Sequence, residues 1–260
     1  MKQQNWNAKD YAQHSKGQEL WARELIAKLD LRGNESILDL GCGDGKITAL
    51  LAQATTGKVV GVDKSEVMIK LAQNSYENIT FLPMDATTLS FENEFDVIFS
   101  NAVLHWVHDH KAVVQGIYKA LKKEGKILLQ FGGYGNAKEI LFVMDAFIAK
   151  EYADSFEDFE FPYSFPHSDI YEVLLQEQGF KNIDAKLIKK DMVHENVEAF
   201  RGWIRTTWFP YTDCLPQNMR ERFVDGFVEA YLELRPLDNE GSVHVDMVRL
   251  EVRAELDVMD

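Results

Sequence analysis

A run of apolar residues that leads directly into three glycines is the feature that most constrains the fold of this chain. Residues 37–40 read Ile-Leu-Asp-Leu, and Gly41, Gly43 and Gly45 follow at alternate positions. A helical pattern begins at Lys46. Because glycine has no Cβ, these positions permit a tight turn and let a ligand approach the backbone closely. A strand, a glycine turn and a helix in this order predict the start of a nucleoside-binding βαβ unit.

An acidic residue at the end of the next predicted strand supports this interpretation. Asp63 follows the apolar run 59–62, at about twenty residues past the turn. A carboxylate accepts hydrogen bonds from both hydroxyls of a ribose without offering a competing donor. Asp63 is therefore a candidate ribose ligand, with a helix cap as the alternative role. Asp39, which precedes the glycines, is a second candidate, with a turn residue as its alternative.

Strand and helix patterns alternate through the first half of the chain. The predicted strands cover 36–40, 58–63, 79–82, 95–100 and 125–131, and the predicted helices cover 18–29, 46–53, 65–74 and 111–121. This alternation predicts a parallel, doubly wound α/β sheet that binds its ligand at the carboxyl ends of the strands.

The pattern changes beyond Gly133. Helices are predicted over 136–152, 168–178, 196–207 and 217–234, with Ser168 as a cap and Gly179 as a stop, and strands over 180–189 and 247–256. Between the first two helices, residues 154–166 mix acids with aromatic residues. We expect a loop there, placed so that it could act as a lid.

The spacing G-x-G-x-G after Asp39 resembles motif I of the class I S-adenosylmethionine-dependent methyltransferases. The resemblance implies a Rossmann-like, doubly wound, seven-stranded and mostly parallel sheet, with the last strand antiparallel and a helical cap. Residues 1–133 would form the cofactor-binding core with an N-terminal lid helix. Residues 134–260 would supply the remaining strands and an inserted substrate cap. S-adenosyl-L-methionine would be the cofactor and S-adenosyl-L-homocysteine its product.

The same resemblance implies roles for individual residues. The three glycines would enclose the methionine and ribose portion of the cofactor, and Asp39 would face its amino group. Acids and backbone groups after the second, third and fourth strands would contact the ribose, the adenine and the methionine portion. The implied cofactor residues are Tyr11, Asp39, Gly41, Gly43, Gly45, Asp63, Lys64, Asp85, Ala86, Asn101 and Ala102.

The methyl acceptor has its own candidate residues. His105 follows the fourth predicted strand and is the candidate general base, with a pocket-shaping role as the alternative, and Trp106 lies beside it. We expect His108 and His110 to be solvated. A carboxylate acceptor, already ionised at neutral pH, needs no base.

The segment Trp203-Ile204-Arg205-Thr206-Thr207-Trp208 resembles the trans-aconitate 2-methyltransferase-like branch, which methylates small carboxylic acids to esters. Arginine can hold a carboxylate through two hydrogen bonds, so Arg205 is the first candidate for acceptor binding and Arg201 the second, with Trp203 beside them. The alternative is that Trp203 and Trp208 are core residues and that Arg205 pairs with a surface acid.

Charge and composition narrow the remaining choices. A net charge of -14 argues against nucleic acid and anionic membranes as partners. The polar N-terminus predicts no signal peptide, and the two cysteines, Cys42 and Cys214, fit a reduced, cytoplasmic setting. The sequence contains no metal motif and no dehydrogenase or P-loop fingerprint. Methylation at carbon, nitrogen or a hydroxyl, methylation of a protein, and a cofactor-binding module without catalysis stay open as alternatives.

Overall fold

The computed structural model describes residues 16–257, and side chains from Trp21 onward. The chain divides into two compact units that interleave in sequence. We call Gln18–Tyr134, Tyr163–Ile188 and Val248–Asp260 the sheet unit. We call Met1–Gly17, Gly135–Pro162 and Lys189–Met247 the helical unit. The division passes through two long strands, between Ile188 and Lys189 and between Met247 and Val248.

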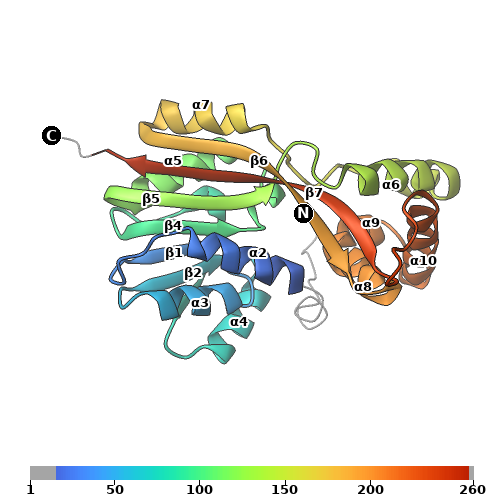
Figure 1. Ribbon diagram of the computed structural model, residues 1–260, viewed down its shortest axis with the longest axis horizontal. Helices are drawn as coiled ribbons and strands as arrows, with labels where there is room; N and C mark the ends of the chain where they lie inside the picture. Colours follow the sequence, from blue (N-terminus) through green and yellow to red (C-terminus); the bar gives the residue numbers. More distant parts are fainter. Residues whose placement is uncertain (1–15, 258–260) are drawn as a thin grey trace. The chain divides into compact units, whose positions relative to one another are not determined.

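Seven strands form one sheet in the order β3-β2-β1-β4-β5-β7-β6 (Figure 1). Their bounds are β1 Ile37–Leu40, β2 Val59–Asp63, β3 Thr80–Pro83, β4 Phe95–Asn101, β5 Leu121–Gly132, β6 Phe180–His194 and β7 Val243–Leu256. The pairs β1–β2, β2–β3, β1–β4 and β4–β5 are parallel, whereas β5 pairs with β7 in the antiparallel sense. The predicted mostly parallel sheet with an antiparallel last strand is confirmed.

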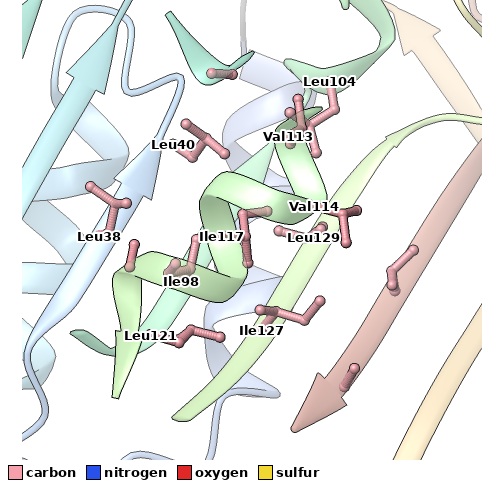
Figure 2. Close-up of a cluster of buried hydrophobic side chains, with 14 of the residues drawn as sticks. Leu38, Leu40, Ile98, Leu104, Val113, Val114, Ile117, Leu121, Ile127 and Leu129 are labelled. Atoms are coloured by element: carbon pink, nitrogen blue, oxygen red, sulfur yellow. The ribbon is translucent and has the colours of Figure 1, made fainter. Parts of the chain in front are cut away.

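Helices cover both faces of this sheet. In the sheet unit they are α2 (Lys16–Ala27), α3 (Lys46–Ala54), α4 (Glu66–Ser75), α5 (His110–Ala120) and α7 (Ser168–Gln178). Leu25 and Leu51, from α2 and α3, pack with Ile37 and Leu128 on one face. The opposite face carries a larger cluster that includes Tyr171 and Leu175 of α7. Figure 2 shows Val113, Val114 and Ile117 of α5 in this cluster. A parallel sheet buried on both faces requires nearly continuous apolar strands, and all four residues of β1 are buried.

The last three strands begin earlier or end later than predicted. β5 begins at Leu121 rather than 125, and its register against β4 shifts between Phe95 and Val97. Glu124 adopts a left-handed φ of 61° in this stretch. β6 continues to His194 and β7 begins at Val243. The residues added to β7, Val-His-Val-Asp, alternate between apolar and polar as a strand does, so the predicted start was four residues late.

Helix ends follow local capping chemistry with one correction. Ser65 accepts a hydrogen bond from the Met68 amide and caps α4, as predicted. Ser168 is the first residue of α7, and His167 occupies the cap position without a side-chain hydrogen bond. Gly179 ends α7 with a left-handed φ of 96°.

The helical unit contains α6 (Lys138–Glu151), α8 (Val197–Thr207), α9 (Phe209–Asp213) and α10 (Gln217–Leu234). The short helix α9 was not predicted, and a 3₁₀ turn, Ala153–Phe156, includes the first residues of the predicted loop 154–166. Aromatic rings make up much of the core of the helical unit. The centre of the Phe147 ring is 5.4 Å from that of Phe223 and 5.5 Å from that of Tyr152. Within residues 16–257, no helix is both long and apolar enough to cross a membrane.

Candidate cofactor and acceptor site

The glycine turn connects β1 to α3 and depends on conformations that other residues rarely adopt. Gly41 and Gly45 have φ values of 81° and 82°. A Cβ on Gly41 would overlap the side chain of Val103, and a Cβ on Gly45 would lie 2.7 Å from the Phe81 ring. The turn is therefore packed closely against the segment that follows β4 and against β3.

Asp63 ties this turn to β2. One carboxylate oxygen accepts from the Gly43 amide at 3.0 Å, and the other accepts from the Ser65 amide at 2.8 Å. Burial raises the pKa of Asp63, while these two amides oppose the rise. The Gly41 and Cys42 amides both donate to the Val62 carbonyl, at 2.7 and 2.9 Å. Strand β2 thus fixes both the turn and the carboxylate that faces it.

Asp39 is 2% exposed and accepts a hydrogen bond from Thr48 Oγ1 of α3 at 2.7 Å. Burial, together with the nearby charge of Asp63, raises the pKa of Asp39 to about 7. Two carboxylates therefore flank the glycine turn. Such a pair attracts a cationic group, because a positive charge would relieve their mutual repulsion.

Asp85 caps a short 3₁₀ helix, Ala86–Thr88, that follows β3. Its carboxylate accepts from the amide and the hydroxyl of Thr87, at 2.9 and 2.7 Å, and Lys64 lies 3.2 Å away. Burial raises the pKa of Asp85, but these hydrogen bonds and the Lys64 ammonium hold it below its ordinary value. Asp85, Ala86 and Lys64 are thus brought to the same sheet edge as Asp63.

The end of β4 is anchored to both neighbouring strands. Ser100 Oγ donates to the Leu40 carbonyl at 2.7 Å, and the Ala102 amide donates to the Gln130 carbonyl at 2.7 Å. Ala102 has a left-handed φ of 60°, which is uncommon for a residue with a side chain. This conformation turns the chain after Asn101 towards the glycine turn, where Val103 packs.

His105 lies in a 3₁₀ helix, Leu104–Trp106, and is 8% exposed. Its Nδ1 accepts from the Gly132 amide at 3.4 Å. Burial, followed by the charges of Arg249 and His110, lowers the pKa of His105 well below 6.5. The imidazole is therefore neutral at physiological pH, and this hydrogen bond assigns its proton to Nε2. In this state His105 is a hydrogen-bond donor, and the predicted general-base role stays a prediction.

Sequence reasoning missed an aromatic wall beside His105. Tyr163 stacks with Phe165 at 5.7 Å and packs on Trp106 at 4.7 Å. The Ser164 amide donates to the His105 carbonyl at 2.8 Å. The predicted loop is therefore fixed to the sheet unit from Tyr163 onward. The density of aromatic residues in 154–166 was the available signal.

His110 corrects a second expectation. It is buried rather than solvated, with Nδ1 2.8 Å from the Tyr171 hydroxyl and Nε2 3.0 Å from Ser164 Oγ. Burial lowers its pKa to about 4. This neutral histidine joins α5 to α7 and to the aromatic wall. His108 is exposed, as expected.

The remaining candidates belong to the helical unit. Trp203 on α8 is 3% exposed and meets Trp208 edge to face at 5.9 Å, as the core-packing alternative expects. Arg201 forms ion pairs with Asp225 and Glu198, so its guanidinium already interacts with two carboxylates. Arg205 is half-buried on the same helix.

Tyr11 lies outside the described residues. Among residues that are described, no group of three or more His, Cys, Asp or Glu could hold a metal ion.

Comparisons with known proteins agree with this geometry. A nucleoside-type glycine turn at the edge of a Rossmann-like sheet defines the class of fold, and the methyltransferase domain family matches residues 38–129. An uncharacterized methyltransferase of Schizosaccharomyces pombe is 30% identical over 218 residues, covering 77% of this chain and 82% of the relative. The chain belongs to the class I S-adenosylmethionine-dependent methyltransferases, and S-adenosyl-L-methionine is its cofactor.

Two further proteins are similar to this chain, one in sequence over most of its length and one in fold. Trans-aconitate 2-methyltransferase of Enterobacter sp. (strain 638) is 25% identical over 250 residues, which cover 95% of this chain and 96% of that protein. Haemonchus contortus phosphoethanolamine N-methyltransferase 2, solved in complex with S-adenosyl-L-methionine, aligns with a TM-score of 0.61 at 19% identity. That alignment covers 96% of this chain and 57% of the other, and it shows the shared fold.

Proposed function

We propose that this enzyme transfers the methyl group to a carboxylate oxygen of a small acid. The observation that supports the proposal most is the length of the similarity to trans-aconitate 2-methyltransferase. It extends over 95% of the chain and therefore well beyond residues 38–129, which match the general methyltransferase domain. A relationship that includes the helical unit favours a related class of acceptor.

For the donor, we propose the residues that the sheet edge brings together. Gly41, Gly43 and Gly45 are proposed to contact the methionine and ribose portion through their backbone, in a tight turn that all three build with positive φ angles. Asp63 is proposed to accept from the ribose hydroxyls and Asp39 to face the amino group. Adenine contacts are assigned to Asp85 and Ala86 with Lys64 beside them, and backbone contacts to Asn101 and Ala102.

For the reaction, the protein chiefly has to hold two reactants in line. When bound, the cofactor supplies an activated methyl group that a carboxylate oxygen accepts, while the carbon–sulfur bonding pair stays on sulfur and S-adenosyl-L-homocysteine forms. Positioning of this kind contributes roughly 7–11 kcal/mol. No residue has to remove a proton from an ionised acid, so a neutral His105 that donates from Nε2 fits this acceptor.

Arg205 of the helical unit is proposed to bind the acceptor carboxylate, with Trp203 close by on α8. Arg205→Ala is expected to raise KM for an acid acceptor by about 10- to 100-fold, because a hydrogen bond between charged groups is lost. KM for S-adenosyl-L-methionine should stay unchanged. An unaltered KM for every acid would remove Arg205 from acceptor binding.

We also propose a cytoplasmic location, in keeping with the free cysteines Cys42 and Cys214.

The test uses S-adenosyl-L-methionine labelled in the methyl group, with a panel of mono-, di- and tricarboxylic acids that includes trans-aconitate. Product is then treated with mild base. Volatile label released by base identifies methyl esters and supports the proposal. Base-stable label would assign the chain to carbon, nitrogen or ether-oxygen methylation. Label in a protein band would identify a protein acceptor, and binding of the cofactor without any turnover would indicate a binding module.

A further inference from the structure

Arg249 is a buried cation at the sheet edge that carries the glycine turn. It lies on β7, where its Cα is opposite that of Gly132, the last residue of β5. Its side chain is 3% exposed, and its guanidinium carbon is 5.5 Å from the centre of the Trp21 ring. A cation held in such surroundings interacts strongly with an anion that reaches it, because little water screens the pair.

The strand pairing links Arg249 to His105 through Gly132. The Gly132 amide, directly across the strand pair from Arg249, is the group that donates to His105 Nδ1. The His105 ring continues into the aromatic wall of Trp106, Tyr163 and Phe165. The charge of Arg249 acts on His105, so the two groups are near enough to interact, and the aromatic wall borders the imidazole.

The next residue on the same face of β7, Glu251, contacts several charged and polar groups. Glu251 accepts from Lys28 at 2.6 Å and from Gln130 at 3.0 Å, and the Arg253 guanidinium is 3.6 Å away. Alternate residues of a strand share a face, so Arg249, Glu251 and Arg253 form a row along β7. Arg249 is the member of that row at the carboxyl end of β5, where ligands bind in sheets of this kind.

We propose that Arg249, with the Nε2–H of His105, binds a carboxylate of the acceptor that is not itself methylated. This inference rests on the proposed function and narrows it to acids with at least two carboxylates. A guanidinium that binds both oxygens of a carboxylate engages their lone pairs and offsets the charge, which makes both oxygens poor nucleophiles. The carboxylate that receives the methyl group must therefore be a second one, left to face the donor. Arg205, proposed above to bind the methylated carboxylate, has to leave one of its oxygens open.

The test measures binding rather than turnover. Enzyme saturated with S-adenosyl-L-homocysteine is titrated calorimetrically with trans-aconitate, fumarate and crotonate, which carry three, two and one carboxylates. Wild-type enzyme is expected to bind trans-aconitate and fumarate at least about 10-fold more tightly than crotonate. Arg249→Met should remove that preference, with affinity for the polycarboxylates falling by about 10- to 100-fold and affinity for crotonate unchanged.

Two further variants keep the result interpretable. Arg253→Met removes an arginine from the same face of the same strand and should bind all three acids as wild type does. Arg249→Lys retains the charge but loses the two-pronged geometry, and an intermediate loss of affinity is expected. If Arg249→Met fails to fold, the acid affinities of Arg249→Lys test the proposal instead. Affinity for S-adenosyl-L-homocysteine should be the same in every variant.

Equal acid binding by wild type and either Arg249 variant would overturn the inference. So would a wild-type enzyme that binds none of the acids, or an Arg249 variant that loses affinity for S-adenosyl-L-homocysteine, since the arginine would then serve the cofactor. Failure of the proposed function has a separate signature, namely no base-labile methyl product from any acid. If an acid binds through Arg249 without being methylated, only the proposed function fails.

Discussion

At the scale of single residues, the candidate site depends on groups held in costly environments. Asp39 is buried with a raised pKa, Ala102 has a left-handed backbone, and Arg249 is a nearly inaccessible cation. A buried carboxylate and a left-handed backbone each cost folding free energy by themselves. Their concentration at the carboxyl ends of β1, β4 and β5 marks this edge as the functional one.

Substitution of Gly41 tests whether close packing against Val103, in addition to backbone strain, requires glycine in the turn. Gly41→Ala adds a Cβ that overlaps Val103 at a φ of 81°, whereas Gly33→Ala adds one at a φ of 96° with nothing within 4 Å. We expect Gly33→Ala to cost about 1 kcal/mol of unfolding free energy from strain alone. Gly41→Ala should cost at least about 1–3 kcal/mol more. Urea denaturation of both variants measures the difference, and equal losses would contradict the packing described for the turn.

Asp39 predicts a pH dependence of stability with a definite sign. Its pKa rises from about 3.9 in the unfolded chain to about 7 in the fold, so the folded state binds the proton more tightly. The ligand-free protein should therefore lose stability as the pH rises between these values. Asp39→Asn removes that loss, and its stability relative to wild type should increase by about 1–3 kcal/mol from pH 4 to pH 7.

The measurement is urea unfolding without cofactor across this pH range. Glu92→Gln, which removes one exposed negative charge, is the matched control and should follow the wild-type curve. A stability difference between Asp39→Asn and wild type that does not change with pH would refute the assignment of a raised pKa.

At the scale of elements, polar contacts near the ends of strands and helices determine where an element ends and which neighbouring segments it is joined to. Strand β7 illustrates this in the helical unit. His244 on β7 contacts Asp191 of β6 through Nδ1 at 2.7 Å and Asp238 of the preceding loop through Nε2 at 3.0 Å. An imidazole donates from both nitrogens only when it is protonated, so its charged form joins these three segments.

These two carboxylates raise the pKa of His244, with the hydrogen bond to Asp238 the larger influence. A raised pKa in the fold means that the stabilisation is complete below about 6.5 and is lost as the pH rises through the folded value. His244→Gln should therefore destabilise the protein at about pH 6, and the difference from wild type should shrink at about pH 9. Thermal unfolding at both pH values tests this. His108→Gln, at an exposed histidine, should have no such dependence.

Element prediction succeeded where one physical signal dominated. Continuous apolar runs located β1, β2 and β4, and side-chain or glycine capping located the ends of α4 and α7. It was less accurate where neighbouring strands set the boundary. β7 begins at Val243, four residues before the predicted start, and β5 includes a register shift that pairing with β4 accommodates. Helix α9 is five residues long, too short for a periodic pattern.

At the scale of the whole molecule, cofactor binding should stabilise the parts of the sheet unit that surround the glycine turn. S-adenosyl-L-homocysteine at one hundred times its Kd raises the free energy of unfolding by about 2.7 kcal/mol. Hydrogen exchange with and without the ligand should slow in residues 39–45, 63–65, 85–88 and 100–106. Helix α7, which packs on the face opposite α2 and α3, is the internal control. Uniform slowing throughout the sheet unit would argue against a site at this edge.

The sequence alone determined the family, the order of the strands and of the longer helices, and the residues proposed to bind the methyl donor. These follow from local signals, because a glycine turn, an acid after the next strand and apolar periodicity are each written in contiguous residues. Only the tertiary structure pointed to Arg249 as a residue proposed to bind the acceptor. Arg249, Gly132 and His105 are distant in sequence and meet only through the antiparallel pairing of β5 with β7. The charge state of His105 depends on burial and on that neighbour, and neither is encoded in the residues beside it.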